Sequence, residues 1–94
     1  ADNSYALRWA AKNGHLEIVK LLITVSDPAD NSYALQLAAK NGHLEIVKLL
    51  ITVSDPKDDN SYALRWAAKN GHLEIVKLLI PVSDPEVVKE LDLN

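Results

Sequence analysis

Three nearly identical copies of one unit of 28 residues fill most of this chain of 94 residues. Residues 3–28 and 31–56 differ at two of 26 aligned positions, and residues 60–85 differ from the first copy only in having Pro81 in place of Thr24. A repeat of this length predicts a solenoid, in which each unit buries its apolar face against its neighbours instead of in a core of its own.

Each unit divides into two helical segments at an Asn-Gly pair, which is Asn13-Gly14 in the first unit. Glycine just beyond a helix often takes a left-handed backbone and ends the helix, so this pair predicts the turn of a helical hairpin. We expect one helix over residues 4–13, capped by Asn3 and Ser4, and a second helix from His15 to Ile23 or Thr24.

The two helices differ in how much of their surface is apolar. The Ala10-Ala11 pair gives the first helix a thin face, which an adjacent helix can approach closely. The second helix is apolar around most of its circumference and has one polar stripe, formed by Glu17, Lys20 and Thr24. We therefore expect the second helix to be the inner one, covered by its hairpin partner and by both neighbouring units.

The junction over residues 24–30 offers two places for the next helix to begin. Asp27-Pro28 could start it, with aspartate as the N-cap and proline at the first helical position. Asn31 and Ser32 could cap it instead, and we favour this later start because asparagine and serine are poor residues for a helix interior. The next junction is one residue longer, which a loop absorbs easily.

We expect a single domain over residues 1–94, with repeats at about residues 2–28, 30–56 and 59–85. Asp84-Pro85 is a helix-start signal, and Val87, Val88 and Leu91 follow at helical spacing, so residues 86–94 are predicted to form a cap on the last unit. We expect no such cap on the first unit. An uncapped solenoid end exposes an apolar face on which another copy of the chain can stack.

Residues 10–23, which recur at 38–51 and 67–80, resemble the end of the first helix, the glycine turn and the whole second helix of an ankyrin repeat. Two departures stand out. Tyr5-Ala6-Leu7-Arg8 replaces the family's Thr-Pro-Leu-His, and Val25-Ser26-Asp27-Pro28 replaces its Gly-Ala-Asp loop and β-hairpin finger. The resemblance implies an all-α solenoid of three stacked helical hairpins plus a C-terminal capping helix, with the β-finger reduced or absent.

Composition argues against several classes of partner. A net charge of −3 with both signs interspersed does not favour nucleic acid, which binds to clustered basic surfaces. No apolar stretch approaches the roughly 20 residues that span a bilayer, and the N-terminus lacks the pattern of a signal peptide. We expect a soluble protein with no membrane partner, cytoplasmic if expressed as it stands, in a compartment that the sequence does not identify.

The sequence also predicts no enzyme, no metal site and no cofactor. His15, His43 and His72 occupy equivalent positions in units that stack roughly 10 Å apart, whereas ligands of one metal ion converge to about 2 Å from it. We interpret them as hydrogen-bonded turn residues. Without cysteine there is no thiolate nucleophile, and the chain has no Ser nucleophile elbow, phosphate loop or calcium-loop pattern.

The family resemblance implies a protein partner, of unknown identity, and a surface on which it would bind. The implied positions are the Ser, Lys and Asn that recur around each first helix, and they are identical in all units. They are Ser4, Lys12, Asn13, Ser32, Lys40, Asn41, Ser61, Lys69 and Asn70. A surface tuned to one irregular partner should differ between units, so the identity indicates an undiversified scaffold or a repetitive ligand.

Two adjacent positions vary along the first helices, as Arg8/Trp9, Gln36/Leu37 and Arg65/Trp66. We interpret the Trp/Leu variation as core packing. The favoured hypothesis is an engineered or consensus-type ankyrin-like scaffold without catalytic activity, because natural drift erases such identity. The alternatives are a natural ankyrin-like protein–protein interaction module expanded by recent duplication, and a homo-oligomer that self-assembles through its uncapped N-terminal face.

Overall fold

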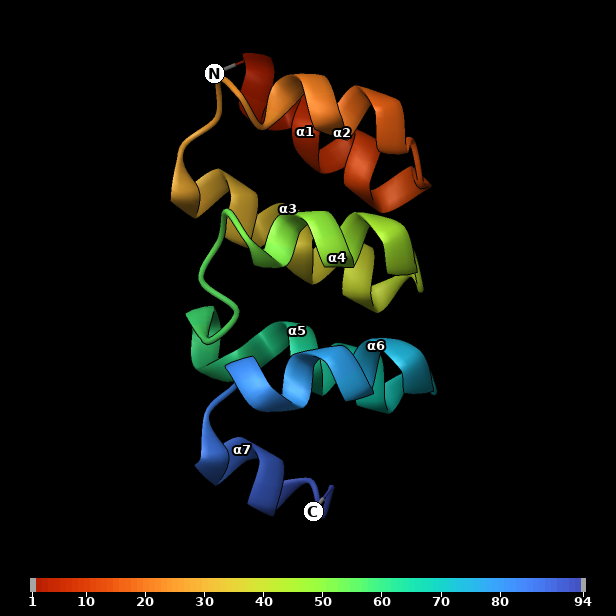
Figure 1. Ribbon diagram of the computed structural model, residues 1–94, viewed down its shortest axis with the longest axis vertical. Coiled ribbons are helices and arrows are strands. Elements are labelled where there is room, and N and C mark those ends of the chain that lie inside the picture. The colour runs from red at the N-terminus through yellow and green to blue at the C-terminus, as the bar shows by residue number, and fades with distance from the viewer. Residues whose placement is uncertain (1, 94) are drawn as a thin grey trace.

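Three helical hairpins and a capping helix are stacked along one axis in the computed structural model, which describes residues 2–93 apart from the side chains of residues 2, 3, 59 and 60 (Figure 1). The molecule measures 37 × 20 × 16 Å. The hairpins are α1 (Asp2–Asn13) with α2 (Leu16–Leu22), α3 (Pro28–Lys40) with α4 (Leu44–Ile51), and α5 (Asp58–Lys69) with α6 (Leu73–Leu79); η1 (Ile80–Val82) and α7 (Pro85–Glu90) follow. Residues 2–93 contain no strand, so the predicted all-α solenoid with its β-finger reduced or absent is confirmed.

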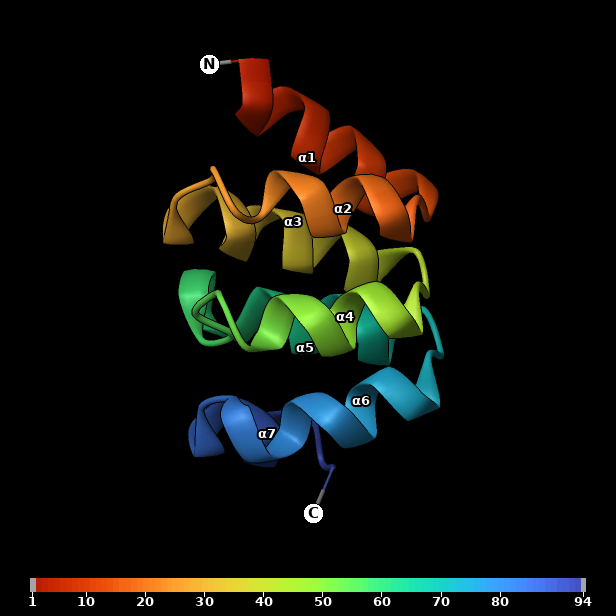
Figure 2. The same ribbon diagram turned by 45° about the horizontal axis from the view of Figure 1, so that its top comes forward.

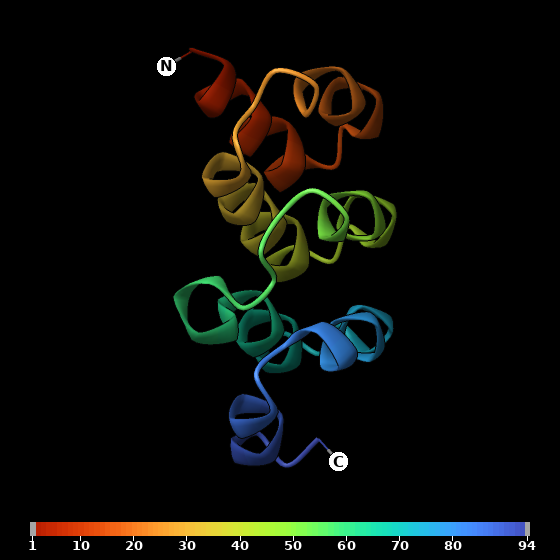
Figure 3. The same ribbon diagram turned by 60° about the vertical axis from the view of Figure 1, so that its left-hand side comes forward.

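The helices lie in two layers, which Figure 3 shows nearly end-on. In one layer α1 packs on α3, α3 on α5 and α5 on α7. In the other layer α2, α4 and α6 follow one another and contact one another less extensively than α1, α3 and α5 do. Figure 2 shows each hairpin lying directly on the next along the long axis. The first helices therefore form the continuous seam of the solenoid.

Small side chains make this seam tight. Ala10 and Ala11 in α1 are fully buried, as are Ala38 and Ala39 in α3 and Ala67 in α5. The predicted close approach at the alanine pairs is confirmed. Leucines fill the space beside them, and Leu7, Leu35 and Leu64 are fully buried. Burying one leucine side chain contributes about 1.5–3 kcal/mol to folding.

The expectation that the second helices are the inner ones is wrong. Even α4, which has a neighbour on both sides, leaves Leu44 and Leu49 only partly buried. The first helix of the same unit buries residues on most of its turns. The alanine pairs explain the difference, because they let the first helices approach one another while the bulky second helices pack on that layer from one side only.

The favoured position for the start of the helix in the second unit is also wrong. Helix α3 begins at Pro28, and the Asp27 side chain accepts a hydrogen bond of 2.9 Å from the amide of Asp30. Asn31 and Ser32 lie inside the helix and are buried. Their side chains bind elsewhere in the unit, since Asn31 donates to the carbonyl of Val53 (3.1 Å) and the Ser32 hydroxyl accepts from the amide of Asp55 (2.8 Å).

In the third unit the extra junction residue changes this start. Asp55-Pro56 does not begin a helix, and α5 starts at Asp58. Ser61 then takes a left-handed backbone, with φ of 58°, a conformation that costs a non-glycine residue about 1–2 kcal/mol. The buried Ser61 hydroxyl still accepts the amide of Asp84 at 2.9 Å, as Ser32 does with Asp55. The left-handed residue thus returns the chain to the register of the repeat.

Neighbouring units are joined by the turn histidines. Nε2 of His43 donates to the carbonyl of Lys12 (2.9 Å), and Nε2 of His72 donates to the carbonyl of Lys40 (3.0 Å). Each acceptor carbonyl lies in the last turn of the first helix of the preceding unit. The prediction of hydrogen-bonded turn histidines is confirmed for these two residues. His15 instead stacks on Trp9, with ring centroids 4.8 Å apart.

The predicted C-terminal cap is confirmed as α7. Val87 and Val88 are buried, and Leu91 and Leu93 pack against the core from partly exposed positions. Because α7 lies on α5, it takes the place that the first helix of a further unit would occupy (Figure 3).

Substitution of the turn glycines should separate the cost of the left-handed backbone from the cost of disturbing a neighbouring unit. Gly42 and Gly71 both have positive φ, of 79° and 75°. A Cβ at Gly42 would lie 2.8 Å from Cε1 of His72, whereas a Cβ at Gly71 would meet nothing within 4 Å. We expect Gly71→Ala to lower the unfolding free energy by about 1 kcal/mol, and Gly42→Ala to lower it by about 1 kcal/mol more because His72 loses its hydrogen bond.

Urea unfolding of each variant, alone and with His72→Ala, measures these terms. In the His72→Ala background the two glycine substitutions should cost the same. Equal costs in the native background would contradict the contact between the units.

Candidate protein-binding face on the first helices

One stripe of each first helix points away from the buried alanines and leucines. Its members are spaced i, i+3, i+4 and i+7, so they lie on one side of the helix. In α1 they are Tyr5, Arg8, Trp9 and Lys12. We call the stripes of the three first helices together the first-helix face. In α3 and α5 its members, all at least partly exposed except the buried Gln36, are Tyr33, Gln36, Leu37, Lys40, Tyr62, Arg65, Trp66 and Lys69.

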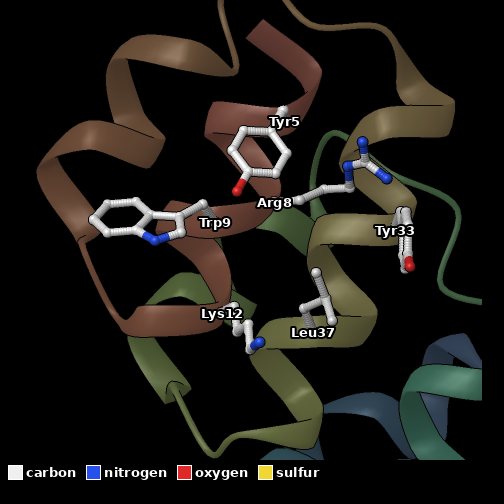
Figure 4. A pocket seen from close by; sticks show the side chains of 6 residues that line it. All are labelled: Tyr5, Arg8, Trp9, Lys12, Tyr33 and Leu37. Carbon is white, nitrogen blue, oxygen red and sulfur yellow. The ribbon is translucent and has the colours of Figure 1, made fainter. Parts of the chain in front are cut away.

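Two hollows lie on this face, one at each step between helices. The hollow between α1 and α3 has a volume of about 420 Å³, and the six side chains drawn in Figure 4 line it. The hollow between α3 and α5 has a volume of about 130 Å³. Tyr33 and Leu37 line both hollows, so these side chains of α3 form a wall that the two hollows share. The second hollow is lined by Tyr33, Gln36, Leu37, Lys40, Tyr62 and Trp66.

Aromatic rings on this face remain accessible to solvent. Tyr5 is 68% exposed, Trp9 47% and Tyr33 46%, whereas the leucines two residues away, Leu7 and Leu35, are fully buried. The interpretation of the Trp/Leu position as core packing is therefore wrong for Trp9. Exposed Tyr, Trp and Arg side chains are the residues most enriched at the centres of protein interfaces.

Cations on this face lie over the aromatic rings. The Arg8 guanidinium is 5.0 Å from the ring centroid of Tyr33, and Figure 4 shows its side chain crossing from α1 toward α3. Nζ of Lys40 is 4.2 Å and Nζ of Lys69 is 5.0 Å from the ring centroid of Trp66. Such a contact contributes about 0.5–1 kcal/mol at an exposed site. These contacts join cations of one helix to rings of the same or the next helix.

The nine residues that the family resemblance implies as partner contacts do not share one environment in the structure. Ser32 and Ser61 are buried, and their hydroxyls accept backbone amides. The Ser4 hydroxyl is partly buried and donates to the Asp30 carboxylate at 2.6 Å. These three serines therefore lie in contacts within the protein.

The lysines and asparagines of the same set are exposed at the ends of the first helices. Lys12, Lys40 and Lys69 belong to the first-helix face. Asn13 and Asn41 donate to carbonyls one turn earlier, of Trp9 and Leu37, and Asn70 donates to the carbonyl of Lys40 in the preceding unit. The lysines thus lie on the same stripe as the aromatic residues, while the asparagine side-chain amides donate hydrogen bonds to carbonyls near the helix ends.

The aromatic residues and arginines of this face are not among the partner positions that the sequence implies. Tyr5 and Trp9 alternate at helical spacing with Arg8 and Lys12. That shared spacing was the available signal, because cations on the same stripe require it to face solvent.

The arginine of the third unit is joined to the cap. Its two terminal nitrogens donate to both oxygens of Glu90, at 2.7 and 3.2 Å, and so tie α5 to α7. The hydrogen bonds from Arg65 lower the pKa of Glu90 and, reciprocally, the Glu90 carboxylate raises the pKa of Arg65.

The fold and the exposed face define a helical repeat solenoid that presents a binding surface. The sequence model for ankyrin repeats (3 copies) matches residues 7–90, and the chain belongs to the ankyrin repeat family. No curated protein and no solved structure matches the chain. Ankyrin repeats mediate protein–protein interactions and are generally non-catalytic, so the family identifies a protein-interaction module.

Among the residues that the structure describes, no helix has the length and apolar character needed to cross a membrane. Within residues 2–93, no three His, Asp or Glu side chains come together in a way that could hold a metal ion.

Acid should weaken the attachment of the cap. Because the pKa of Glu90 is lowered in the folded state, its pair with Arg65 stabilises the protein above the ordinary carboxylate pKa of about 4.3, and this stabilisation is lost as the pH falls through the lowered value. We expect Glu90→Gln to be less stable than the native chain at neutral pH and equal to it at strongly acid pH. Urea midpoints across that range provide the measurement.

Glu74→Gln is the matched control, because Glu74 pairs with Lys77 within one helix through a single contact of 3.3 Å. It should show a smaller difference. A gap between the native chain and Glu90→Gln that is independent of pH would show that the pair does not stabilise the cap.

Proposed function

We propose that the chain is an ankyrin-repeat scaffold of engineered or consensus type, without catalytic activity, whose first-helix face is a framework for binding another protein. The near-identity of the units supports an origin in which the fold was built first. Natural sequences keep buried positions and drift at exposed ones, yet exposed lysines such as Lys20, Lys48 and Lys77 are also the same in every unit.

The accessible aromatic rings carry the assignment of the binding surface. Each first helix buries one leucine completely, yet Tyr5, Trp9 and Tyr33 stay open on one face, beside a hollow. Contiguous exposed apolar surface of this kind marks interaction sites on soluble proteins. Lys12, Lys40 and Lys69, three of the positions implied by the family resemblance, lie on the same face, whereas the buried Ser32 and Ser61 are left out of the proposed contact surface.

Peptides selected from a random display library against the chain test this proposal. We expect Tyr33→Ala to weaken the selected peptides about tenfold or more, because Tyr33 lines both hollows and loss of a central aromatic residue is costly at interfaces. Leu73→Ala is the control, since Leu73 is 70% exposed on α6, outside the face. Peptides that depend on Leu73 and not on Tyr33 would contradict the assignment of the binding surface.

A natural interaction module enlarged by recent duplication is the alternative origin. The same face would then have acquired a partner after duplication. Diverged ankyrin units flanking this segment in a gene would favour the natural origin and contradict the engineered one.

Self-association is a second candidate function, and a specific observation favours it. Ile18, Leu21 and Val25 of the first unit are 41%, 74% and 62% exposed, whereas Ile46 and Ile75, the equivalents of Ile18, are each 2% exposed. A preceding unit covers the isoleucine in α4 and α6, but nothing within residues 2–93 covers it in α2. A second copy of the chain offers the same apolar chemistry.

Analytical ultracentrifugation over a range of concentrations tests the self-association. We expect a mass above that of the monomer that rises with concentration, and a monomer for Leu21→Lys, because a charge in an apolar interface costs free energy. Leu73→Lys places the same charge at the opposite end of the second layer and should leave a dimer through the N-terminal unit unchanged. A native chain that stays monomeric at every concentration would remove this candidate.

A further inference from the structure

Positive and negative charges are segregated along the repeat. Residues 4–13, 32–41 and 61–70, which form most of the first helices, contain no Asp or Glu and hold half of the chain's lysines and arginines. These cations are Arg8, Lys12, Lys40, Arg65 and Lys69. The chain as a whole has a net charge of −3, and its acidic residues lie at the starts of the first helices, in the junctions, on the second helices and in the C-terminal segment.

Ion pairing makes this segregation stronger. On the second helices, Lys20, Lys48 and Lys77 each pair with a glutamate three residues earlier, at 3.1 to 3.3 Å. On the first-helix face only Arg65 pairs with a carboxylate in the part of the chain that the structure describes. Three of the other cations contact rings instead of carboxylates. The face is therefore positive on a protein that is negative overall.

The stabilisation of helix ends explains only part of this pattern. Lys12, Lys40 and Lys69 stand in the last turns of their helices, where a cation interacts favourably with the helix dipole. Arg8 stands mid-helix and lies over Tyr33 of the next unit, beside the larger hollow. Both hollows are lined by cations, aromatic rings and leucine, with no carboxylate among the lining residues. A ligand that matches them combines negative charge with apolar side chains.

The spacing of the cations limits the shape of that ligand. Stacked helices lie about 8–10 Å apart, so Lys12, Lys40 and Lys69 recur at about this interval along the solenoid. An extended polyproline-type chain repeats its side-chain direction every third residue, after about 9 Å. Carboxylates at every third residue of such a chain can meet successive lysines, while the residues between them enter the hollows.

We propose that the first-helix face binds an acidic polypeptide segment that is extended along the solenoid axis. Every third residue of this segment carries a carboxylate, and the residues between are apolar. This inference rests on the proposed binding function and specifies the chemistry of its ligand. Opposite charge across an interface accelerates association and selects among partners, and its effect falls as salt is raised.

A synthetic peptide of repeated Glu-Pro-Leu is the probe, and tryptophan fluorescence is the signal. Trp9 and Trp66 are the only tryptophans in the chain and both belong to the face, so binding there should change their emission. We expect saturable binding that weakens with salt. It should weaken about tenfold or more for the repeated Gln-Pro-Leu peptide, and by a similar factor for the triple variant Lys12→Gln, Lys40→Gln and Lys69→Gln.

The matched control is the triple variant Lys20→Gln, Lys48→Gln and Lys77→Gln, which removes the same charge from the second helices and should change the affinity less than about twofold. Circular dichroism establishes that both triple variants fold. Equal losses from the two triple variants, or binding of oligothymidylate as tight as that of the acidic peptide, would overturn the proposal in favour of general attraction to anions.

Failure of the inference can be told apart from failure of the proposed function. If library-selected peptides depend on Tyr33 but are not enriched in Asp and Glu, or if Gln-Pro-Leu binds as well as Glu-Pro-Leu, the face binds peptides and the acidic preference is wrong. If no selected peptide depends on Tyr33, the proposed function itself is wrong. Absence of any binding by the Glu-Pro-Leu peptide overturns the inference alone.

Discussion

Close packing of the first helices through their alanine pairs is the constraint on which the rest of the structure depends. Ala10-Ala11 and Ala38-Ala39 have no side-chain bulk, so the helix axes approach and the leucines beside them are sealed from water. Most of the opposite stripe of each helix then faces solvent, and Gln36 is its one buried member. The same seam determines the place of α7, which adds a fourth helix to that layer.

Equivalent residues of the three units differ in burial and contacts, although the unit sequences are nearly identical. The difference depends on the position of the unit in the stack. The isoleucine at the start of the second helix is 41% exposed in the first unit and 2% exposed in the other two. A Cβ on the turn glycine would strike a histidine at Gly14 and Gly42 but nothing at Gly71. In a solenoid each unit contacts only its neighbours, so the energy of a side chain depends on whether a neighbour exists.

The period, the hairpins and the terminal cap could be predicted because glycine turns, alanine pairs and proline starts are local signals. Which layer forms the seam could not be predicted, because the apolar circumference of the second helix suggests burial on all sides. The closeness of helix packing depends instead on the alanine pairs of the first helices. The start of α3 was mispredicted from Asn31 and Ser32 for a related reason. Their low helix propensity favours capping, but hydrogen bonds to Val53 and Asp55, distant in sequence, stabilise them inside α3. Tyr5, Trp9 and the arginines were missed because hydropathy alone assigns aromatic rings to the core.

The substitutions in the middle unit set the character of the face. Trp66 lies between Lys69 of its own helix and Lys40 of the preceding one. Leu37 stands where a tryptophan in the second unit would lie between Lys40 and Lys12 in the same way. Because the residue there is leucine, no aromatic ring contacts the Lys12 ammonium. Among the described residues Lys12 has no ion pair or ring contact, and it lines the larger hollow. Its charge is therefore the least compensated on the face. Since a cation is most available to an incoming carboxylate where no ring or acid already binds it, the step between α1 and α3 is where an acidic ligand gains most.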